Sequence, residues 1–207
     1  IFTVTPLRNA PNNVVLDLPP STIERGSTQL TATNMVALLI GGNGAGYVYK
    51  LADWQALIEN MRVLSTTHGW RWLITSSRRT PPEVEDFLEA HIPLSIIEEA
   101  IWFNKQPQKV MKRFLKTADA IFVTEDSLTM VAEAIFSARP VCTLQPRTMR
   151  PDQNDADALT SYAQKGFIKR LPMARLAGGL DMPLTAASLP DIDQQISNAI
   201  KGILHDQ

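Results

Sequence analysis

Short apolar runs and longer segments of mixed polarity alternate along most of the chain. Runs of strand length occupy Met35–Ile40, residues 70–75, residues 96–103, Ala120–Thr124, residues 141–144 and residues 167–171. Such runs are typical of strands that are buried on both faces. Because helical segments separate them, we predict an α/β fold with a Rossmann-like, three-layer, doubly wound parallel sheet. The expected strand order is 3-2-1-4-5-6, with Met35–Ile40 at the centre.

Apolar side chains at helical spacing predict the segments between these strands. The predicted helices cover residues 53–66, 82–91, 107–117, 127–137, 155–166 and 192–204. Asp53 is expected to cap the first helix, and Pro82 to lie in the first turn of the second. Asp126 and Ser127 are good N-cap types at the start of the fourth helix, which a proline ends.

Three polar clusters follow the first, second and fourth predicted strands. Ligands of such sheets bind outside the carboxyl ends of the strands, so the clusters should converge on one crevice. The residues predicted to bind a ligand there are Gly41, Gly42, Asn43, Gly44, Ser76, Ser77, Arg78, Arg79, Glu125, Asp126, Ser127, Met130 and Glu133. This convergence from distant parts of the sequence supports the site more than any single cluster does.

Each cluster has a chemical reason to bind a ligand. Glycines after the first strand let the backbone approach a ligand closely. Arg78 and Arg79 carry fork-shaped donors that suit anions, although a solvated loop pair is the alternative. Ser127 would begin a helix whose first N–H groups attract a phosphate. Glu125 and Glu133 could contact two parts of an extended ligand, but Glu133 taken alone is more simply explained as a solvated helix residue.

Several known binding patterns are absent from the sequence. No Gly-Lys-Ser/Thr completes a P-loop, and Tyr47 stands where a third dinucleotide-binding glycine would be. No Gly-x-Ser-x-Gly elbow indicates a hydrolase. Dispersed histidines and a single cysteine, Cys142, indicate neither a metal site nor a disulfide framework. We therefore expect no metal and no cofactor.

Charge and hydropathy narrow the possible partners. The 207 residues include 20 Lys+Arg and 21 Asp+Glu, which gives no basic bias for nucleic acid. No apolar run reaches the ~20 residues of a membrane span. Cysteine usage fits a reducing compartment, so we expect a cytoplasmic protein. The basic segment 107–117 is expected to be a solvated helix face, and contact with a membrane surface is the alternative.

The first 33 residues differ from the rest of the chain, which opens with Ile1 rather than Met. They contain short extended runs, at 1–5 and 13–18, that turn residues and two prolines interrupt. We expect residues 1–33 to be the remnant of a preceding N-terminal domain with a linker. Residues 34–207 would form the ligand-binding domain. The N-terminal arm should pack on the flank of this domain or pair with a second copy in a homodimer.

Three sequence blocks together resemble the elongated-mitochondria-type fission family. They are Leu-Ile-Gly-Gly at 39–42, Ile-Thr-Ser-Ser-Arg-Arg-Thr-Pro at 74–81, and Val-Thr-Glu-Asp-Ser-x-x-Met-Val-x-Glu at 123–133. That family is in turn similar to the GT-B glycosyltransferases, in which two Rossmann-like domains face each other across a cleft. The C-terminal domain of those enzymes holds most of the nucleotide-sugar donor, and this chain resembles that domain.

The resemblance also implies roles for individual residues. Residues 77–78 would lie near the donor diphosphate, and Ser127 with the helix N-terminus would lie beside the phosphate. Glu125 and Asp126 would approach the sugar, and Glu133 would approach the ribose. The glycine loop would face the phosphates or the acceptor.

The implied function is binding of a nucleoside-diphosphate sugar, with glycosyl transfer as the reaction. One alternative is a nucleoside-diphosphate-sugar epimerase that uses much the same pocket. The other is a non-catalytic adaptor that has kept a glycosyltransferase-like fold. The sequence identifies no catalytic base, because in GT-B enzymes that group commonly comes from the N-terminal domain.

Overall fold

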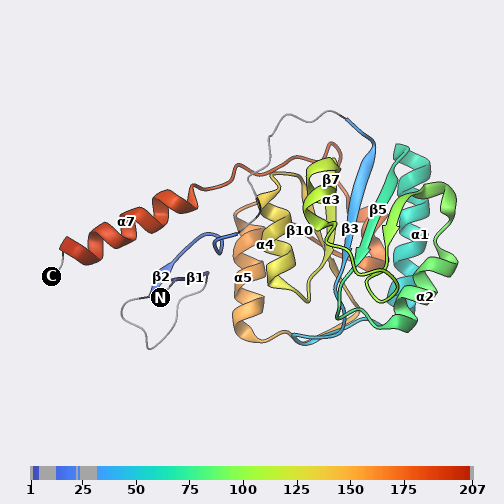
Figure 1. Ribbon diagram of the computed structural model, residues 1–207, viewed down its shortest axis with the longest axis horizontal. Helices are drawn as coiled ribbons and strands as arrows, with labels where there is room; N and C mark the ends of the chain where they lie inside the picture. The colour runs from blue at the N-terminus through green and yellow to red at the C-terminus, as the bar shows by residue number, and fades with distance from the viewer. Residues whose placement is uncertain (1, 5–12, 22, 24–31, 206–207) are drawn as a thin grey trace.

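A six-stranded parallel sheet forms the centre of the molecule (Figure 1). The computed structural model describes residues 2–4, 13–21, 23 and 32–205. The strands of the sheet are β3 (Met35–Ile40), β5 (Arg71–Ser76), β6 (Ile97–Ile101), β7 (Ala120–Thr124), β8 (Val141–Gln145) and β10 (Lys169–Pro172). They lie in the order β10-β8-β7-β3-β5-β6, which confirms the predicted strand order and the central place of β3.

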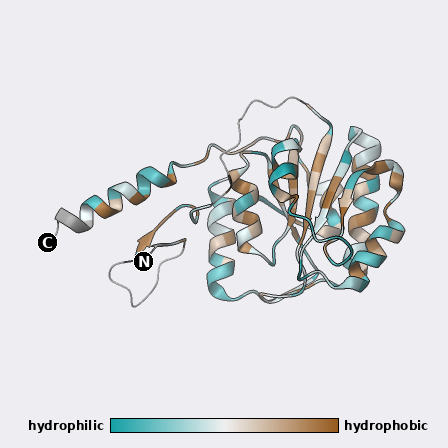
Figure 2. Cartoon of the chain, in the orientation of Figure 1, coloured by the Kyte–Doolittle hydropathy of each residue, from teal (hydrophilic) through white to brown (hydrophobic). Residues whose placement is uncertain are grey.

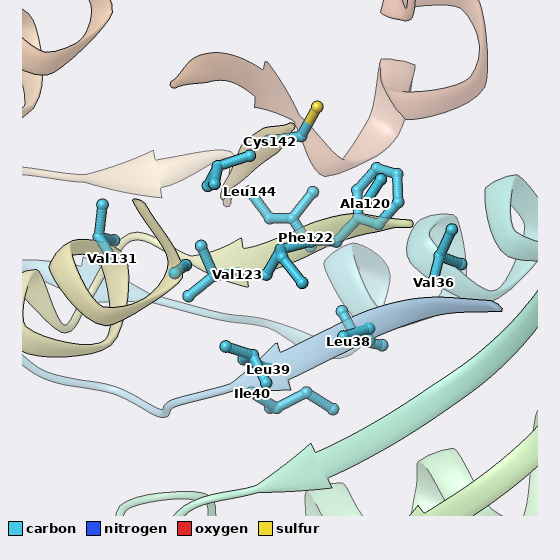
Figure 3. Packing of buried hydrophobic residues seen from close by; sticks show 14 of the residues in the cluster. Val36, Leu38, Leu39, Ile40, Ala120, Phe122, Val123, Val131, Cys142 and Leu144 are labelled. Carbon is cyan, nitrogen blue, oxygen red and sulfur yellow. The ribbon is translucent and has the colours of Figure 1, made fainter. Parts of the chain in front are cut away.

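The core lies against both faces of this sheet. Five consecutive side chains of β3, at positions 36–40, are fully buried, as expected of a central parallel strand. Figure 3 shows Leu38 and Leu39 of β3 beside the side chains of β7, among them Phe122. The four tryptophans are all buried. Cys142 is buried in β8, and burial raises the pKa of its thiol to about 12.

Helices cover both faces of the sheet (Figure 1). One face carries α1 (Leu51–His68), α2 (Pro82–His91) and the short α6 (Leu176–Gly179). The other face carries α3 (Met111–Thr117), α4 (Leu128–Phe136) and α5 (Gln153–Gln164). Short 3₁₀ turns, η1 (Leu94–Ile96) and η2 (Met173–Arg175), precede β6 and α6.

Three helix starts differ from the prediction. Asp53 does not cap α1, because the helix begins earlier and Asp53 Oδ2 accepts the N–H of Lys50, the N-cap residue, at 3.0 Å. The α3 helix begins at Met111 rather than at residue 107, because the preceding segment follows the wall of a pocket and buries Val110 there. Asp152 rather than a later residue caps α5, with its side chain accepting a backbone N–H.

Two small sheets lie outside the main sheet. β4 (Tyr47–Val48) pairs antiparallel with β9 (Thr148–Met149), next to the carboxyl ends of the main strands. β1 (Phe2–Thr3) and β2 (Val14–Val15) form a parallel pair. The predicted N-terminal strands at 1–5 and 13–18 are therefore shorter than expected, and residues 1 and 5 lie outside the described part of the chain.

The described part of the N-terminal segment packs on the flank of the main domain. Leu16 and Leu18 are buried. Between them, Asp17 forms an ion pair with Lys165 at the end of α5 and hydrogen bonds with Gln195 of α7 (Ile192–His205). This packing agrees with the expected position of the arm, while the division into residues 1–33 and 34–207 stays a prediction.

The α7 helix extends away from the sheet, beside β1 and β2 (Figure 1). It carries both hydrophobic and hydrophilic residues along its length (Figure 2). Ile192 at its start is buried, whereas Ile200 is 46% exposed. Within the described residues, no helix has the length and apolar character that crossing a bilayer requires.

Candidate functional site

A pocket of about 380 Å³ lies at the carboxyl ends of β3 and β5. Its walls come from the loop after β5, the segment between β6 and α3, and one face of α4. The lining residues are Ile23, Ile40, Thr75, Ser76, Ser77, Arg78, Phe103, Gln108, Lys109, Val110, Met111, Lys112, Met130 and Glu133. The pocket thus joins an apolar floor to three basic side chains and one carboxylate.

The loop after β5 is held as a tight turn. The N–H of Thr80 donates to the carbonyl of Ser77 at 2.9 Å, and the Thr80 hydroxyl donates to the carbonyl oxygens at the end of β3. Arg78 and Arg79 are the two central residues of this turn. Arg78 is exposed, lines the pocket, and has no hydrogen bond or ion pair with any residue that the structure describes.

Arg79 is held against a different partner. Its Nη2 lies 2.8 Å from Oδ2 of Asp126, whose carboxylate is fully buried. The same nitrogen donates to the Asp126 carbonyl at 3.3 Å. Neither Arg79 nor Asp126 lines the pocket. Adjacent arginines that the sequence could not distinguish therefore have different surroundings.

The glycine loop packs against these same residues. The N–H of Gly41 donates to Thr124 Oγ1 at 2.8 Å, and the N–H of Gly42 donates to Asp126 Oδ2 at 3.0 Å. A Cβ on Gly42 would lie 2.0 Å from the carbonyl oxygen of Arg79, so only glycine allows this close approach. Gly41 and Gly42 are buried, and none of the four predicted loop residues lines the pocket.

Asn43 and Gly44 are the other two residues of the glycine loop that were predicted to bind a ligand. The side-chain oxygen of Asn43 accepts the N–H of Tyr49 at 2.8 Å, and Gly44 exchanges backbone hydrogen bonds with Tyr47. These bonds shape the connection between β3 and β4. The prediction that the loop binds a ligand stays a prediction.

The α4 helix brings Met130 and Glu133 to the pocket. Ser127 is its N-cap, as expected, and its Oγ accepts the N–H of Met130 at 3.5 Å. Burial raises the pKa of Glu133, and the nearby positive charge of Lys112 partly opposes that effect. Glu133 is half-buried at the pocket wall, and its contact with a ligand stays a prediction.

Glu125 lies at the end of β7 but does not face the pocket. Its side chain is fully buried, and Arg170 of β10 contacts both carboxylate oxygens, each at 2.8 Å. Thr143 Oγ1 donates to Oε1 at 2.6 Å, while Tyr47 and Gln145 donate to Oε2 at 3.3 Å. Both oxygens of this carboxylate therefore have partners within the protein.

Several pocket residues were not predicted from the sequence. Phe103, Met111 and Lys112 come from a segment that the sequence assigned to a strand and to a solvated helix face. Glu85 of α2 supports this wall from behind, since it is fully buried, accepts the Ser76 hydroxyl at 2.5 Å and accepts the N–H of Asn104. Glu85 stands three residues before the buried Leu88, a spacing that marks it as inward-facing. No group of His, Cys, Asp and Glu side chains suited to a metal occurs among the described residues.

Residues 3–191 match the model of a protein family described as mitochondrial fission ELM1. The chain belongs to this family. Membership in the ELM1 family confirms the resemblance found in the three sequence blocks. No curated protein matches the chain.

Solved structures similar to this ELM1 family chain include a glycotransferase of kitacinnamycin, at 16% identity and a TM-score of 0.47. The alignment covers 91% of this chain and 43% of that one. E. coli ADP-heptose LPS heptosyltransferase II aligns at 12% identity and a TM-score of 0.45, over 83% of this chain and 46% of that one. The MAR1 ribonuclease from Caenorhabditis elegans aligns at 10% identity and a TM-score of 0.43, over 83% of this chain and 90% of that one. The chain thus spans less than half the length of either transferase.

Proposed function

We propose that the pocket binds a nucleoside-diphosphate sugar and that the protein takes part in glycosyl transfer. The observation that carries the proposal is the composition of the pocket at the carboxyl ends of β3 and β5. An apolar floor, a basic rim and one carboxylate meet there within about 380 Å³. Ligands of doubly wound sheets occupy this position in the fold.

The parts of a nucleotide fit the parts of this pocket. Phe103, Met111 and Met130 offer apolar and polarizable contacts to a base. Glu133 can accept hydrogen bonds from a ribose diol, because a carboxylate is an acceptor on both oxygens. The guanidinium of Arg78 suits a diphosphate, since its fork of N–H groups matches phosphate oxygens.

One observation favours a different function, that of a non-catalytic adaptor. The family resemblance would place Glu125 beside the donor sugar. In the structure Arg170 contacts both oxygens of Glu125, which leaves this carboxylate no free oxygen for a substrate. A chain of this kind could bind a nucleotide without chemistry and serve to recruit other proteins.

Calorimetry with UDP-, GDP-, ADP- and CMP-sugars, followed by product analysis of any ligand that binds, tests the proposal. Glu133→Gln keeps the size of the side chain but removes its charge. A hydrogen bond to a charged group contributes about 1.5–3 kcal/mol, so binding should weaken by about tenfold or more. Glu59→Gln on the exposed face of α1 is the matched control and should bind as the wild type does.

The pH dependence gives a second measurement on the same site. Since burial raises the pKa of Glu133, its acceptor form predominates only above that raised value. Binding by the wild type should therefore strengthen as the pH rises through that pKa, and Glu133→Gln should lose this dependence.

Three outcomes of the binding experiments would change the proposal. Equal affinities of wild type and Glu133→Gln would show that Glu133 does not contact the ligand. Binding without turnover would favour the adaptor, and an altered sugar without transfer would favour the epimerase.

A further inference from the structure

Arg78 and Arg79 are neighbours in one tight turn, but only Arg78 lines the pocket. We propose that Arg78 is the anion-binding residue, and that Arg79 and Asp126 form a positioning pair that holds Arg78 toward the ligand. This assignment rests on the proposed function of the pocket. It separates two arginines that are equivalent in the sequence.

Asp126 is the fixed end of the pair. Its carboxylate is fully buried, and Oδ2 accepts both Arg79 Nη2 at 2.8 Å and the N–H of Gly42 at 3.0 Å. Oδ1 is buried without a hydrogen-bond partner among the described residues. Arg79 therefore supplies the positive charge that this carboxylate needs, because an unpaired buried charge is costly.

Three contacts fix Arg79 in place. Besides the ion pair, its N–H donates to Ser77 Oγ at 3.2 Å. Its carbonyl oxygen occupies the space that a Cβ of Gly42 would need. With its guanidinium bonded to the carboxylate and the carbonyl of Asp126, the Arg79 side chain is directed away from the pocket.

The fixed position of Arg79 determines what Arg78 can do. The two residues are the central pair of a turn closed by the Thr80 to Ser77 hydrogen bond, so they share the same local backbone. With Arg79 directed to the buried carboxylate, Arg78 remains as the guanidinium of the turn that lines the pocket. The turn thus offers a ligand one uncompensated positive charge rather than two.

The test compares binding of UDP, GDP and ADP with binding of uridine, guanosine and adenosine. Arg78→Gln should weaken binding of the diphosphate by about tenfold or more and leave the nucleoside nearly unchanged. Arg79→Gln and Asp126→Asn should each weaken diphosphate binding by about threefold. The double variant should lose no more than the larger single loss, and Arg79→Lys should recover part of it. Arg71→Gln, which removes an ion pair with Glu98 at the opposite end of β5, is the control.

Three results would overturn the assignment. Additive losses in the double variant would make Arg79 and Asp126 independent contributors to binding. Equal weakening of diphosphate and nucleoside would indicate general loosening of the site rather than loss of a positioned cation. No effect of Arg79→Gln on binding would leave the pair with a purely structural role and would also refute the proposal.

Arginine modification separates this proposal from the proposed function, because it needs no ligand. Phenylglyoxal labelling followed by peptide mass mapping should modify Arg78 faster than Arg79. Asp126→Asn should raise the rate at Arg79 toward that of Arg78. If no nucleotide binds, the proposed function fails, and equal rates at the two arginines in the wild type would refute the positioning pair by itself.

Discussion

Replacing Arg170 by methionine should destabilise the fold strongly, because it leaves the buried carboxylate of Glu125 without its cation. The Glu125 side chain is fully buried, and that of Arg170 is 23% exposed. Breaking a buried ion pair by removing one partner costs about 3–5 kcal/mol. Because Arg170 is partly exposed and Glu125 keeps its hydrogen bonds to Thr143, Gln145 and Tyr47, we expect the lower end, about 3 kcal/mol.

This loss is large against the total stability of a domain, which is typically about 5–15 kcal/mol. Urea unfolding followed by tryptophan fluorescence measures it, since the four tryptophans are buried and report loss of the core. The chain offers a matched control in Arg113, which makes an equally two-pronged ion pair with Glu99, both contacts at 2.6 Å. That pair is exposed, so Arg113→Met should lower the free energy of unfolding by only a small fraction of the loss expected for Arg170→Met.

A double variant distinguishes the ion pair from loss of packing. Glu125→Leu combined with Arg170→Met removes both charges, and it should recover at least half of the stability that Arg170→Met loses. An Arg170→Met variant no less stable than Arg113→Met would refute the reasoning. If Glu125→Gln weakened binding of a nucleotide sugar without changing the free energy of unfolding, Glu125 would be a ligand-binding residue after all.

Two further predictions concern the glycine loop and the N-terminal arm. Gly42→Ala should lower the free energy of unfolding, measured in urea, by about 1–3 kcal/mol, because its Cβ would lie 2.0 Å from the Arg79 carbonyl oxygen. Gly178 has open space around it, so Gly178→Ala should leave the free energy of unfolding unchanged or raise it. A hydrogen bond from Lys165 lowers the pKa of Asp17, so the contact stabilises the fold above the unfolded pKa and is lost as the pH falls through the lowered value. Thermal unfolding between pH 7 and pH 3 should therefore be less pH-dependent in Asp17→Asn, and an unchanged profile would contradict the contact.

The sheet was predictable because parallel strands carry their signature in short stretches of sequence. An apolar run such as Met35–Ile40 has no polar face, and a run of this length that ends in glycines is typical of a strand buried on both sides. The start of α4 was predictable for a similarly local reason, since Ser127 caps the helix with its own side chain. The start of α3 was not, because it depends on a distant contact, the burial of Val110 in the pocket wall. At α1 the prediction chose the wrong position within a local motif, since Asp53 accepts the N–H of Lys50 from inside the first turn.

The site was predictable to the level of the strand ends but not to the level of single side chains. Ser77, Arg78 and Glu133 come together in the pocket from two of the three predicted clusters. The sequence could not indicate that the neighbouring Arg79 is paired, or that Glu125 meets an arginine from β10. Such pairings depend on which residues the sheet order brings side by side, and that order joins segments far apart in the chain.

The central place of β3 also sets the order in which the sheet can be completed. One edge of β3 pairs with residues 71–76, and the other edge pairs with residues 120–123. A ribosome that has released the chain only as far as residue 101 therefore presents β3 with one edge paired and the other open. An open edge of a fully apolar strand is a template for pairing with other chains. Shortened chains that end before β7 should therefore aggregate, and β7 is the strand whose arrival during synthesis protects the core.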